Sequence, residues 1–367
     1  MILITNIALG ALWWLLAAEI AAALAGWQGL VIGGRRWLVL SAPLLGGLSW
    51  LLTGNTSTDW LAWGISAPPG LLLFALLALL RQRERRPETI LAPGERHGRR
   101  IVELAIPIEG GPMPALLVEP AGGCSRAVLI VHGAGNHKMF YAWPLLHGLS
   151  DAGFAACAID VDGHGDNPRV LDLPHVLDNV AAGVDWLRER YASVAVLGIS
   201  QGGCIGARAV AEGVAADALI LLEAPITVEV TKAVIRREML TLALPATWAL
   251  HRDVGTLGIV QGWRTKPTRA RIGTVELIRR LDLLDSVARI SCPLLLCYGG
   301  SDAVVPRSQA HAVAAAAPPG TTFALVPRAT HLSLSIDGRV IRLVRDWLHA
   351  ALEPTTERAQ PPVLFDE

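Results

Sequence analysis

From residue 101 onward, short β-branched runs alternate with stretches of helical pattern. Strands separated by helices imply βαβ units, in which a mostly parallel sheet is covered on both faces. The alternation therefore predicts an α/β fold with helices on both sides of the sheet. The predicted strands are an opening hairpin (101–108 and 113–118) followed by 127–131, 155–160, 194–197, 218–222, 293–298 and 322–326, and the predicted helices are 175–191, 201–212, 308–317 and 339–352.

The first 80 residues differ sharply, because they contain only four charged side chains. Three long apolar stretches, 3–25, 37–54 and 60–80, are each near the length of about 20 residues that crosses a bilayer as a helix. Seven of the 12 tryptophans fall in this region, mostly near the ends of these stretches, as an interfacial aromatic belt would place them. The segment predicts a membrane region of about three transmembrane helices.

Basic residues predict the orientation of these spans. Arg35 and Arg36 separate the first two spans, whereas the link between the second and third has no Lys or Arg, and arginines follow residue 80. The positive-inside rule then places everything after residue 81 in the cytoplasm, as part of a multi-pass membrane protein. Two features leave alternatives open: prolines in the second and third stretches permit a re-entrant or kinked segment, and Glu19 marks either an interfacial position or a function inside the membrane.

Composition excludes several classes of protein. With 52% hydrophobic and 17% charged residues and a net charge of zero, the chain is neither disordered nor a uniformly basic nucleic-acid binder. Its five cysteines are scattered, without the spacing of a disulfide framework or a zinc site, and no paired-histidine motif is present. We therefore expect buried free thiols, no catalytic metal, no cofactor and no nucleic-acid partner.

The clearest chemical motif is Gly198-Ile199-Ser200-Gln201-Gly202, which stands between a predicted strand and a predicted helix. Alone, G-x-S-x-G is weak, but this context is that of a nucleophile elbow, in which small residues allow a sharp turn that exposes the serine. The helix that follows points its positive end at the serine, where negative charge develops in acyl transfer. We predict that Ser200 is a nucleophile; the alternative is a glycine-rich turn with an idle serine.

A serine nucleophile needs a base that is itself oriented by an acid. In this kind of fold the chain order is Ser, acid, His. Asp302 and His331 follow predicted strands in that order, in loops at the end of the sheet where catalytic side chains gather. We predict these two as acid and base. Glu223, which follows another strand, is the alternative acid.

Acyl transfer also needs two N–H donors for the oxyanion. One predicted donor is the backbone of Gln201, directly after the nucleophile, and the other is Ala134, in the small-residue loop after strand 127–131. His132 begins that loop, and we expect it to brace the loop rather than to take part in the chemistry.

These motifs together resemble the α/β-hydrolase superfamily, and within it the group of monoglyceride lipases, lysophospholipases and serine-aminopeptidase-like proteins. The resemblance implies an α/β-hydrolase fold and ester hydrolysis through an acyl-enzyme, with Ser200, Asp302 and His331 as triad. One departure concerns substrate choice, because Ile199 and Gln201 stand where those lipases commonly have His and Met. The matching segments are VHGAGNHKMFY (131–141), DVDGHGDN (160–167), GISQGG (198–203), YGGSDAVVP (298–306) and ATHLS (329–333).

The predicted layout has a membrane region, a linker, a hydrolase domain and a tail. The cap, residues 225–289, carries 11 basic against six acidic side chains and an apolar run that contains Trp248. It is either a lid that meets an anionic membrane or a solvated helical cap with an internal apolar face. The ranges are 1–80 for the membrane region, 81–100 for the basic linker, 101–353 for the hydrolase domain and 354–367 for the tail.

The sequence thus predicts a membrane-anchored serine hydrolase that cleaves esters of lipids or other hydrophobic substrates, with membrane lipids as further partners. A peptidase, aminopeptidase or thioesterase would use the same triad, because triad chemistry does not read the leaving group. The alternative outside the enzymes is a non-catalytic membrane protein that uses the same fold for binding.

Overall fold

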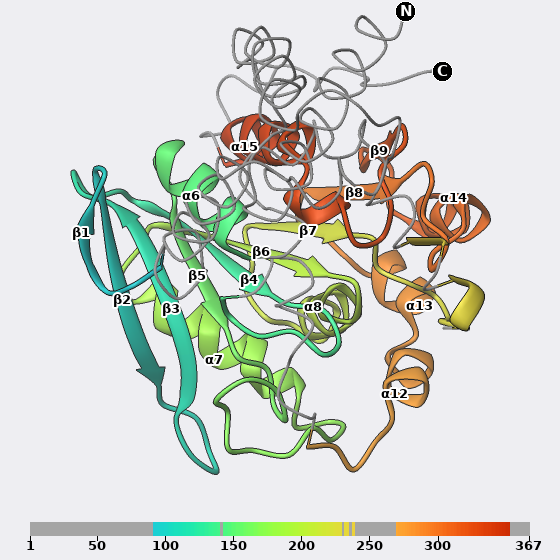
Figure 1. Ribbon diagram of the computed structural model, residues 1–367, viewed down its shortest axis with the longest axis horizontal. Coiled ribbons are helices and arrows are strands. Elements are labelled where there is room, and N and C mark those ends of the chain that lie inside the picture. Colours follow the sequence, from blue (N-terminus) through green and yellow to red (C-terminus); the bar gives the residue numbers. More distant parts are fainter. Residues whose placement is uncertain (1–90, 140–141, 230, 235–236, 239–268, 353–367) are drawn as a thin grey trace, which may run out of the picture. The chain divides into compact units, whose positions relative to one another are not determined.

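The computed structural model describes residues 91–139, 142–229, 231–234, 237–238 and 269–352 (Figure 1). The three predicted membrane spans, Glu19, residues 81–90 of the basic linker and the C-terminal tail lie outside the described residues. Among the residues that are described, no helix combines the length and the hydropathy needed to cross a membrane.

Within these ranges the strands form one nine-stranded sheet, in the order β1-β2-β3-β5-β4-β6-β7-β8-β9. The pairs from β1 to β3, and β3 with β5, are antiparallel, whereas every pair from β5 to β9 is parallel. The predicted mostly parallel sheet is confirmed. The strands are β1 (Gly94–Arg96), β2 (Arg99–Ile106), β3 (Met113–Pro120), β4 (Arg126–Val131), β5 (Ala155–Ile159), β6 (Ser193–Ile199), β7 (Ala218–Leu222), β8 (Leu294–Gly299) and β9 (Thr322–Val326).

The central strands are apolar along their whole length. Every residue of β5, β7 and β8 is buried, and in β4 and β6 only the first residue is partly exposed. Parallel strands covered by helices on both faces show such continuous apolar runs instead of an alternation of inward and outward side chains. This is why the sequence predicts these strands well.

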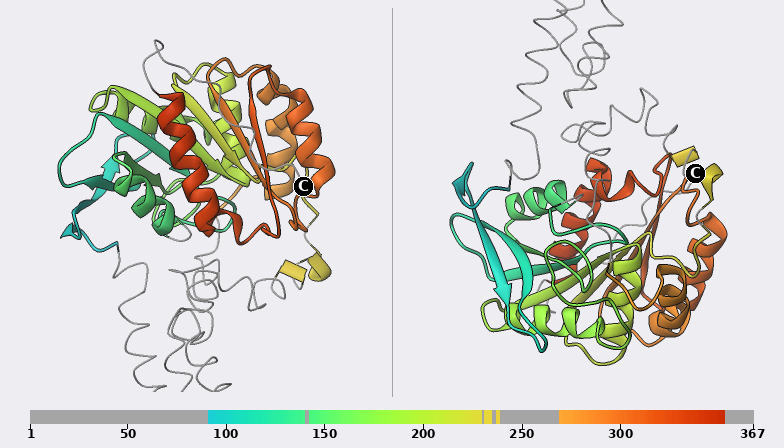
Figure 2. Two further views of the ribbon diagram at one scale, coloured as in Figure 1. Left: turned by 90° about the horizontal axis from the view of Figure 1, so that it is seen from above. Right: turned by 60° about the horizontal axis from the view of Figure 1, so that its bottom comes forward.

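Helices cover both faces of the sheet. Helices α6 and α15 pack together on one face, while α7 and α8 pack together on the other, joined by α12 and α13 (Figures 1 and 2). The helices are α6 (Ala142–Asp151), α7 (Leu177–Arg188), α8 (Gln201–Ala211), α12 (Thr274–Leu281), α13 (Leu283–Ala288), α14 (Arg307–Ala316) and α15 (Gly338–Ala351), with a short 3₁₀ helix, η2 (Leu334–Ile336).

Helix α15 shows how the sequence specifies this packing. Its buried residues recur at the helical period, and its N-terminus is capped by the Asp337 carboxylate, which accepts a hydrogen bond from the Arg339 N–H at 2.8 Å. The buried stripe therefore faces the sheet and leaves the charged side chains in water. Its members are Val340, Leu343, Val344, Trp347 and Leu348.

Part of the range assigned to the cap belongs to the body of the domain. Helices α12 and α13 pack against α8, and Leu277, Leu281 and Val287 lie in the same hydrophobic core as the strands. An amphipathic helix looks alike in sequence whether its apolar side packs on a sheet or inside a cap, so the pattern alone did not separate the two.

The cysteines are unpaired, and Cys157, Cys204 and Cys297 are buried. Burial raises the pKa of these three thiols, because it disfavours the thiolate. These three are small core residues, as expected, whereas Cys124 and Cys292 are partly exposed.

Candidate active site

The carboxyl ends of the parallel strands β6, β8 and β9 lie at one edge of the sheet. Ser200 directly follows β6, Asp302 follows β8, and His331 follows β9. Parallel pairing therefore brings the three side chains together, although Ser200 lies more than 100 residues before the other two in the sequence.

Ser200 occupies a strained turn between β6 and α8. Its backbone has φ 51° and ψ −119°, outside the regions that residues other than glycine normally adopt. The turn is tight because a Cβ at Gly198 would lie 2.5 Å from the carbonyl oxygen of Gly202. The Ser200 N–H donates to the Leu222 carbonyl at 2.8 Å, which ties the turn to β7. This geometry is that of the predicted nucleophile elbow.

His331 joins the serine to the acid. Its Nε2 lies 3.0 Å from Ser200 Oγ, and its Nδ1 lies 2.9 Å from Asp302 Oδ2. The other oxygen of Asp302, Oδ1, accepts hydrogen bonds from the N–H groups of Val304 and Val305, both at 2.7 Å. Asp302 is thus fixed by its own loop and holds the imidazole with Nε2 directed at the serine.

A second carboxylate lies beside the same imidazole. Glu223, the alternative acid, is buried directly after β7 with its Oε2 3.9 Å from His331 Nδ1. Within the described residues this oxygen has no hydrogen-bond partner. The backbone of Glu223 is also in the left-handed region, with φ 49°. In the structure His331 Nδ1 is therefore hydrogen-bonded to Asp302, while Glu223 lies beyond hydrogen-bond distance of the same nitrogen.

The carboxylates determine the charge of the imidazole. Burial of His331 opposes ionisation, but Glu223 and Asp302 outweigh it and raise the pKa of His331 to about 9. Burial also raises the pKa of Glu223 well above its usual value, and the neighbouring Asp302 adds to the rise. An excess of buried carboxylates over cations makes both groups hold their protons more tightly.

The two predicted oxyanion donors line the cavity in which Ser200 lies. Ala134 and Gln201 both contribute to its wall, and within the described residues neither backbone N–H donates to another group. Gly133 lets the first loop come close, because a Cβ there would lie 3.3 Å from the Cβ of Ser200. Two free N–H groups beside the Ser200 hydroxyl, one of them at the N-terminus of α8, suit the binding of an oxyanion.

Hydrogen bonds and an ion pair with neighbouring residues fix the loop that carries Ala134. His132 Nε2 accepts a hydrogen bond from the Val161 N–H at 3.1 Å, and its Nδ1 lies 2.8 Å from the Gly133 carbonyl. Burial, with the neighbouring His164, lowers the pKa of His132 to about 3, so the ring is neutral. Further along the loop, Lys138 forms a buried ion pair with Asp160 at 2.9 Å. The contacts of His132 thus hold the start of this loop against the segment after β5, which is the structural position expected for this residue.

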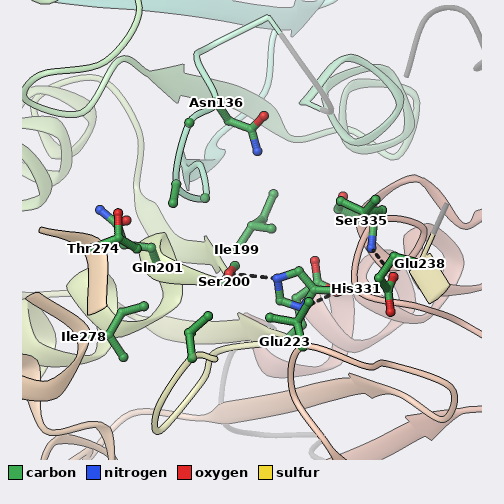
Figure 3. Close-up of a pocket in the computed structure, with 16 residues that line it drawn as sticks. Asn136, Ile199, Ser200, Gln201, Glu223, Glu238, Thr274, Ile278, His331 and Ser335 are labelled. Carbon is green, nitrogen blue, oxygen red and sulfur yellow. Dashed lines mark hydrogen bonds and ion pairs between the residues drawn. The ribbon is translucent and has the colours of Figure 1, made fainter. Parts of the chain in front are cut away.

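The cavity beside Ser200 has a volume of about 420 Å³ (Figure 3). Five of its lining side chains are aliphatic, which suits the apolar part of a substrate: Ile199, Val228, Ile278, Val304 and Leu332. The remaining described lining residues are Gly133, Ala134, Gly135, Asn136, Ser200, Gln201, Glu223, Glu238, Thr274, His331 and Ser335.

The site brings together side chains of types that also bind metal ions. Among the described residues, one group of metal-ligating side chains has its ligand atoms within 4.8 Å of one another, namely Glu223, Asp302 and His331. Since His331 Nδ1 and Asp302 Oδ2 are already hydrogen-bonded to each other, the arrangement is explained by acid–base pairing alone.

A model of the Alpha/beta hydrolase family matches residues 128–341, which is more than half of the chain. The chain belongs to the alpha/beta hydrolase family. The match extends from β4 into α15 and includes all three side chains of the Ser200 site. The superfamily inferred from the sequence is confirmed, whereas the finer likeness to monoglyceride lipases remains an expectation.

Relatives of this alpha/beta hydrolase are esterases by name. A pimeloyl-[acyl-carrier protein] methyl ester esterase from Serratia marcescens is 24% identical over 240 residues, covering 60% of this chain and 92% of its own length. The enzyme of the same name from Neisseria meningitidis is 27% identical over 215 residues, covering 49% of this chain and 76% of its own.

Solved structures share the fold. A thermophilic esterase from Thermogutta terrifontis has a TM-score of 0.53 at 20% identity and covers 69% of this chain and 99% of its own. An esterase from Pyrococcus furiosus has a TM-score of 0.51 at 17% identity, covering 73% and 94% respectively.

Several residues of the cavity were not foreseen from the sequence of this hydrolase. Asn136 lies in a segment that carries the family resemblance, so its position at the site could have been inferred, whereas Thr274, Ser335 and Glu238 lie outside every motif. Nothing in the local sequence marks Glu238, because its contacts are with Ala303 and Leu332, which are 65 and 94 positions away in the chain.

Proposed function

We propose that the protein is a serine hydrolase that cleaves carboxylic esters. The observation that carries this proposal is the chain of contacts from Ser200 Oγ to His331 Nε2, at 3.0 Å, and from His331 Nδ1 to Asp302, at 2.9 Å. Such a chain activates a hydroxyl that is otherwise a poor nucleophile. The esterase relatives support the choice of an ester substrate.

The geometry allows a complete reaction without another group. His331 Nε2 takes the proton of Ser200 as Oγ bonds to the carbonyl carbon of the ester, and the N–H groups of Ala134 and Gln201 hold the oxyanion. The imidazolium returns the proton to the departing alcohol as the carbon–oxygen bond breaks, which leaves an acyl ester on Ser200. Water then attacks this ester by the same route and releases the acid and the free serine.

Labelling and turnover test the proposal directly. The wild-type protein, solubilised in detergent, should react with a fluorophosphonate probe and hydrolyse p-nitrophenyl butyrate. Ser200→Ala should abolish the labelling and lower kcat by about 10⁴-fold or more. Ser335→Ala is the matched control, since it removes a hydroxyl from the same cavity. Folded wild-type protein that neither labels nor turns over would favour the non-catalytic binding protein.

The aliphatic part of the cavity supports a hydrophobic acyl group. Ile199, Ile278 and Leu332 contribute apolar surface within reach of the serine, as expected for a lipid or other hydrophobic ester. A comparison of p-nitrophenyl esters of increasing chain length with matched thioesters and aminoacyl amides tests this choice. Faster turnover of the thioester or amide would favour the thioesterase or peptidase instead.

We also propose that the enzyme is anchored in a membrane, with the hydrolase domain in the cytoplasm. The support is in the sequence: three apolar stretches in the first 80 residues, and the arginines that flank them. Membranes prepared from expressing cells should retain the full chain after extraction with alkaline carbonate. Release of the chain into the soluble fraction would contradict the anchoring without affecting the assignment of the chemistry.

A further inference from the structure

Glu238 contacts the two loops that carry the acid and the base. Its Oε1 accepts a hydrogen bond from the Ala303 N–H at 2.8 Å, and its Oε2 accepts one from the Leu332 N–H at 3.3 Å. Ala303 directly follows Asp302, and Leu332 directly follows His331. One carboxylate thus bridges the backbones next to both members of the acid–base pair, from a segment that belongs to neither loop. Figure 3 shows Glu238 among the residues that line the cavity.

We propose that Glu238 is a positioning residue that holds the Asp302 loop and the His331 loop in register for catalysis. This inference rests on the proposed function, because it concerns the geometry of the same triad. It also gives a function to the segment between β7 and α12, because Glu238 belongs to that segment and lines the cavity.

The chemistry of the side chain fits this task. Glu238 is only 2% exposed, and a buried carboxylate is costly unless hydrogen bonds compensate for lost water. An apolar side chain would fill the same space without that cost. A carboxylate, in contrast, presents two acceptor oxygens in a fixed fork, which matches two converging N–H donors.

The position of the bridge matters for catalysis because the triad tolerates little displacement. His331 must stay within hydrogen-bond reach of Ser200 and Asp302 at once, and a shift of about 1 Å in such a group can cost 10²-fold in rate. The two loops also contact each other through the Ser301 N–H, which donates to the Ala329 carbonyl at 2.8 Å. Glu238 adds a further link between the loops, on the side that faces the cavity.

Glu238 also acts on the charge of the base. Its carboxylate is one of three that favour the protonated form of His331, together with Glu223 and Asp302. The imidazolium that forms when Ser200 gives up its proton is stabilised by this charge. Removal of the charge should therefore be visible in the pH profile as well as in the rate.

The test uses the full chain in detergent with three variants. Glu238→Gln keeps the shape but replaces one acceptor with an amide that faces a backbone N–H. Glu238→Asp keeps the charge on a shorter stem. Glu229→Gln is the matched control, since Glu229 is an exposed residue of the same insertion. The measurements are kcat and KM for p-nitrophenyl butyrate across pH, and hydrogen–deuterium exchange of the peptides that contain Ala303 and Leu332.

We expect Glu238→Gln to lower kcat by about 10-fold to 100-fold while KM changes by less than about three-fold. The acid limb of its pH profile should move to lower pH, and both peptides should exchange faster. Glu238→Asp should restore the position of the acid limb and part of the rate, and it takes over the test if the glutamine variant does not fold. Glu229→Gln should match the wild type in every measurement.

Wild-type kcat and wild-type exchange in Glu238→Gln would overturn the proposal. So would a loss of thermal stability with kcat and pH profile unchanged, which is what a purely structural carboxylate predicts. Hydrogen exchange needs no turnover, so it decides whether Glu238 holds the loops even if the wild type proves inactive. The absence of wild-type hydrolysis, in contrast, would count against the proposed function.

Discussion

The Glu223 carboxylate lies 3.9 Å from Nδ1 of His331. Asp302 holds the same nitrogen at 2.9 Å, so loss of Asp302 leaves a second acid within about 1 Å of hydrogen-bond reach. The negative charge of Asp302 is also one cause of the raised pKa of Glu223, and its removal makes Glu223 easier to ionise.

We therefore expect Asp302→Ala to lower kcat/KM for an ester by about 10²-fold to 10³-fold, and Asp302→Ala with Glu223→Gln to lower it by about 10⁴-fold. Steady-state kinetics of the two single variants and the double variant check this. If Asp302→Ala alone were as inactive as Ser200→Ala, Glu223 would have no reserve function.

The pH profile should report the carboxylates around His331. The imidazole accepts the serine proton only when it is neutral, and its pKa is raised from 6.5 to about 9 against the opposing effect of burial. Hence kcat/KM should rise with pH through an acid limb centred well above 6.5 and near 9.

Replacing Glu223 with Gln removes the largest favourable charge and should move that limb to lower pH. Glu276→Gln, whose wild-type side chain on α12 is 45% exposed, should leave it in place. An unchanged limb in Glu223→Gln would mean that Glu223 carries no charge at the pH of the limb.

Gly202 allows α8 to approach the loop after β4. A Cβ at this position would lie 2.2 Å from the Val131 carbonyl oxygen and 2.4 Å from that of His132, both of which are backbone atoms. Gly202→Ala should lower the free energy of unfolding by about 3 kcal/mol. Denaturant titration checks this, with Gly122→Ala as the control because nothing lies within 4 Å of a Cβ there. Equal midpoints for the two variants would be inconsistent with this packing.

The Lys138–Asp160 pair is almost fully buried, with side chains 7% and 0% exposed. Lys138→Met leaves Asp160 charged and without its cation in a site that water does not reach. We expect this variant to lose about 3–5 kcal/mol of unfolding free energy. The exposed pair between Arg279 and Glu276 supplies the comparison, and Arg279→Met should change stability by less than about 0.5 kcal/mol. Similar losses in both variants would contradict the distinction between a buried and an exposed pair.

The body of the fold was predictable because its signals are local. The apolar runs of β4 to β9 and the amphipathic pattern of α15 are visible in short windows, and the structure agrees with them to within a few residues. Strand β1 and helices α6, α12 and α13 had no predicted ranges of their own, and α12 and α13 lie within the range predicted only as a helical cap. Strand β1 has three exposed residues, Gly94–Arg96, and therefore no hydrophobic pattern, while α6 contains Pro144 and Gly148, which weaken a helical signal.

At the site, the residues that could be predicted were those marked by a motif or by their order along the chain. Ser200, Asp302 and His331 could be chosen because each lies in the turn or loop that follows a strand, and the structure places them in contact. Glu238 could not, because its partners Ala303 and Leu332 are reached only through the tertiary path of the insertion. The relation between Glu223 and Asp302 was left open for a related reason: both follow strands, and only the distances separate them.

The positive φ of Ser200 lowers the folding stability of the chain relative to a glycine at the same position. Glycine adopts such dihedral angles readily, whereas serine holds them at a cost of about 1–3 kcal/mol. An inactive Ser200→Gly chain is therefore expected to be at least as hard to unfold as the active one. A serine at this turn therefore lowers the stability of the fold, and the proposed role of its hydroxyl as nucleophile gives that residue a function that glycine could not supply.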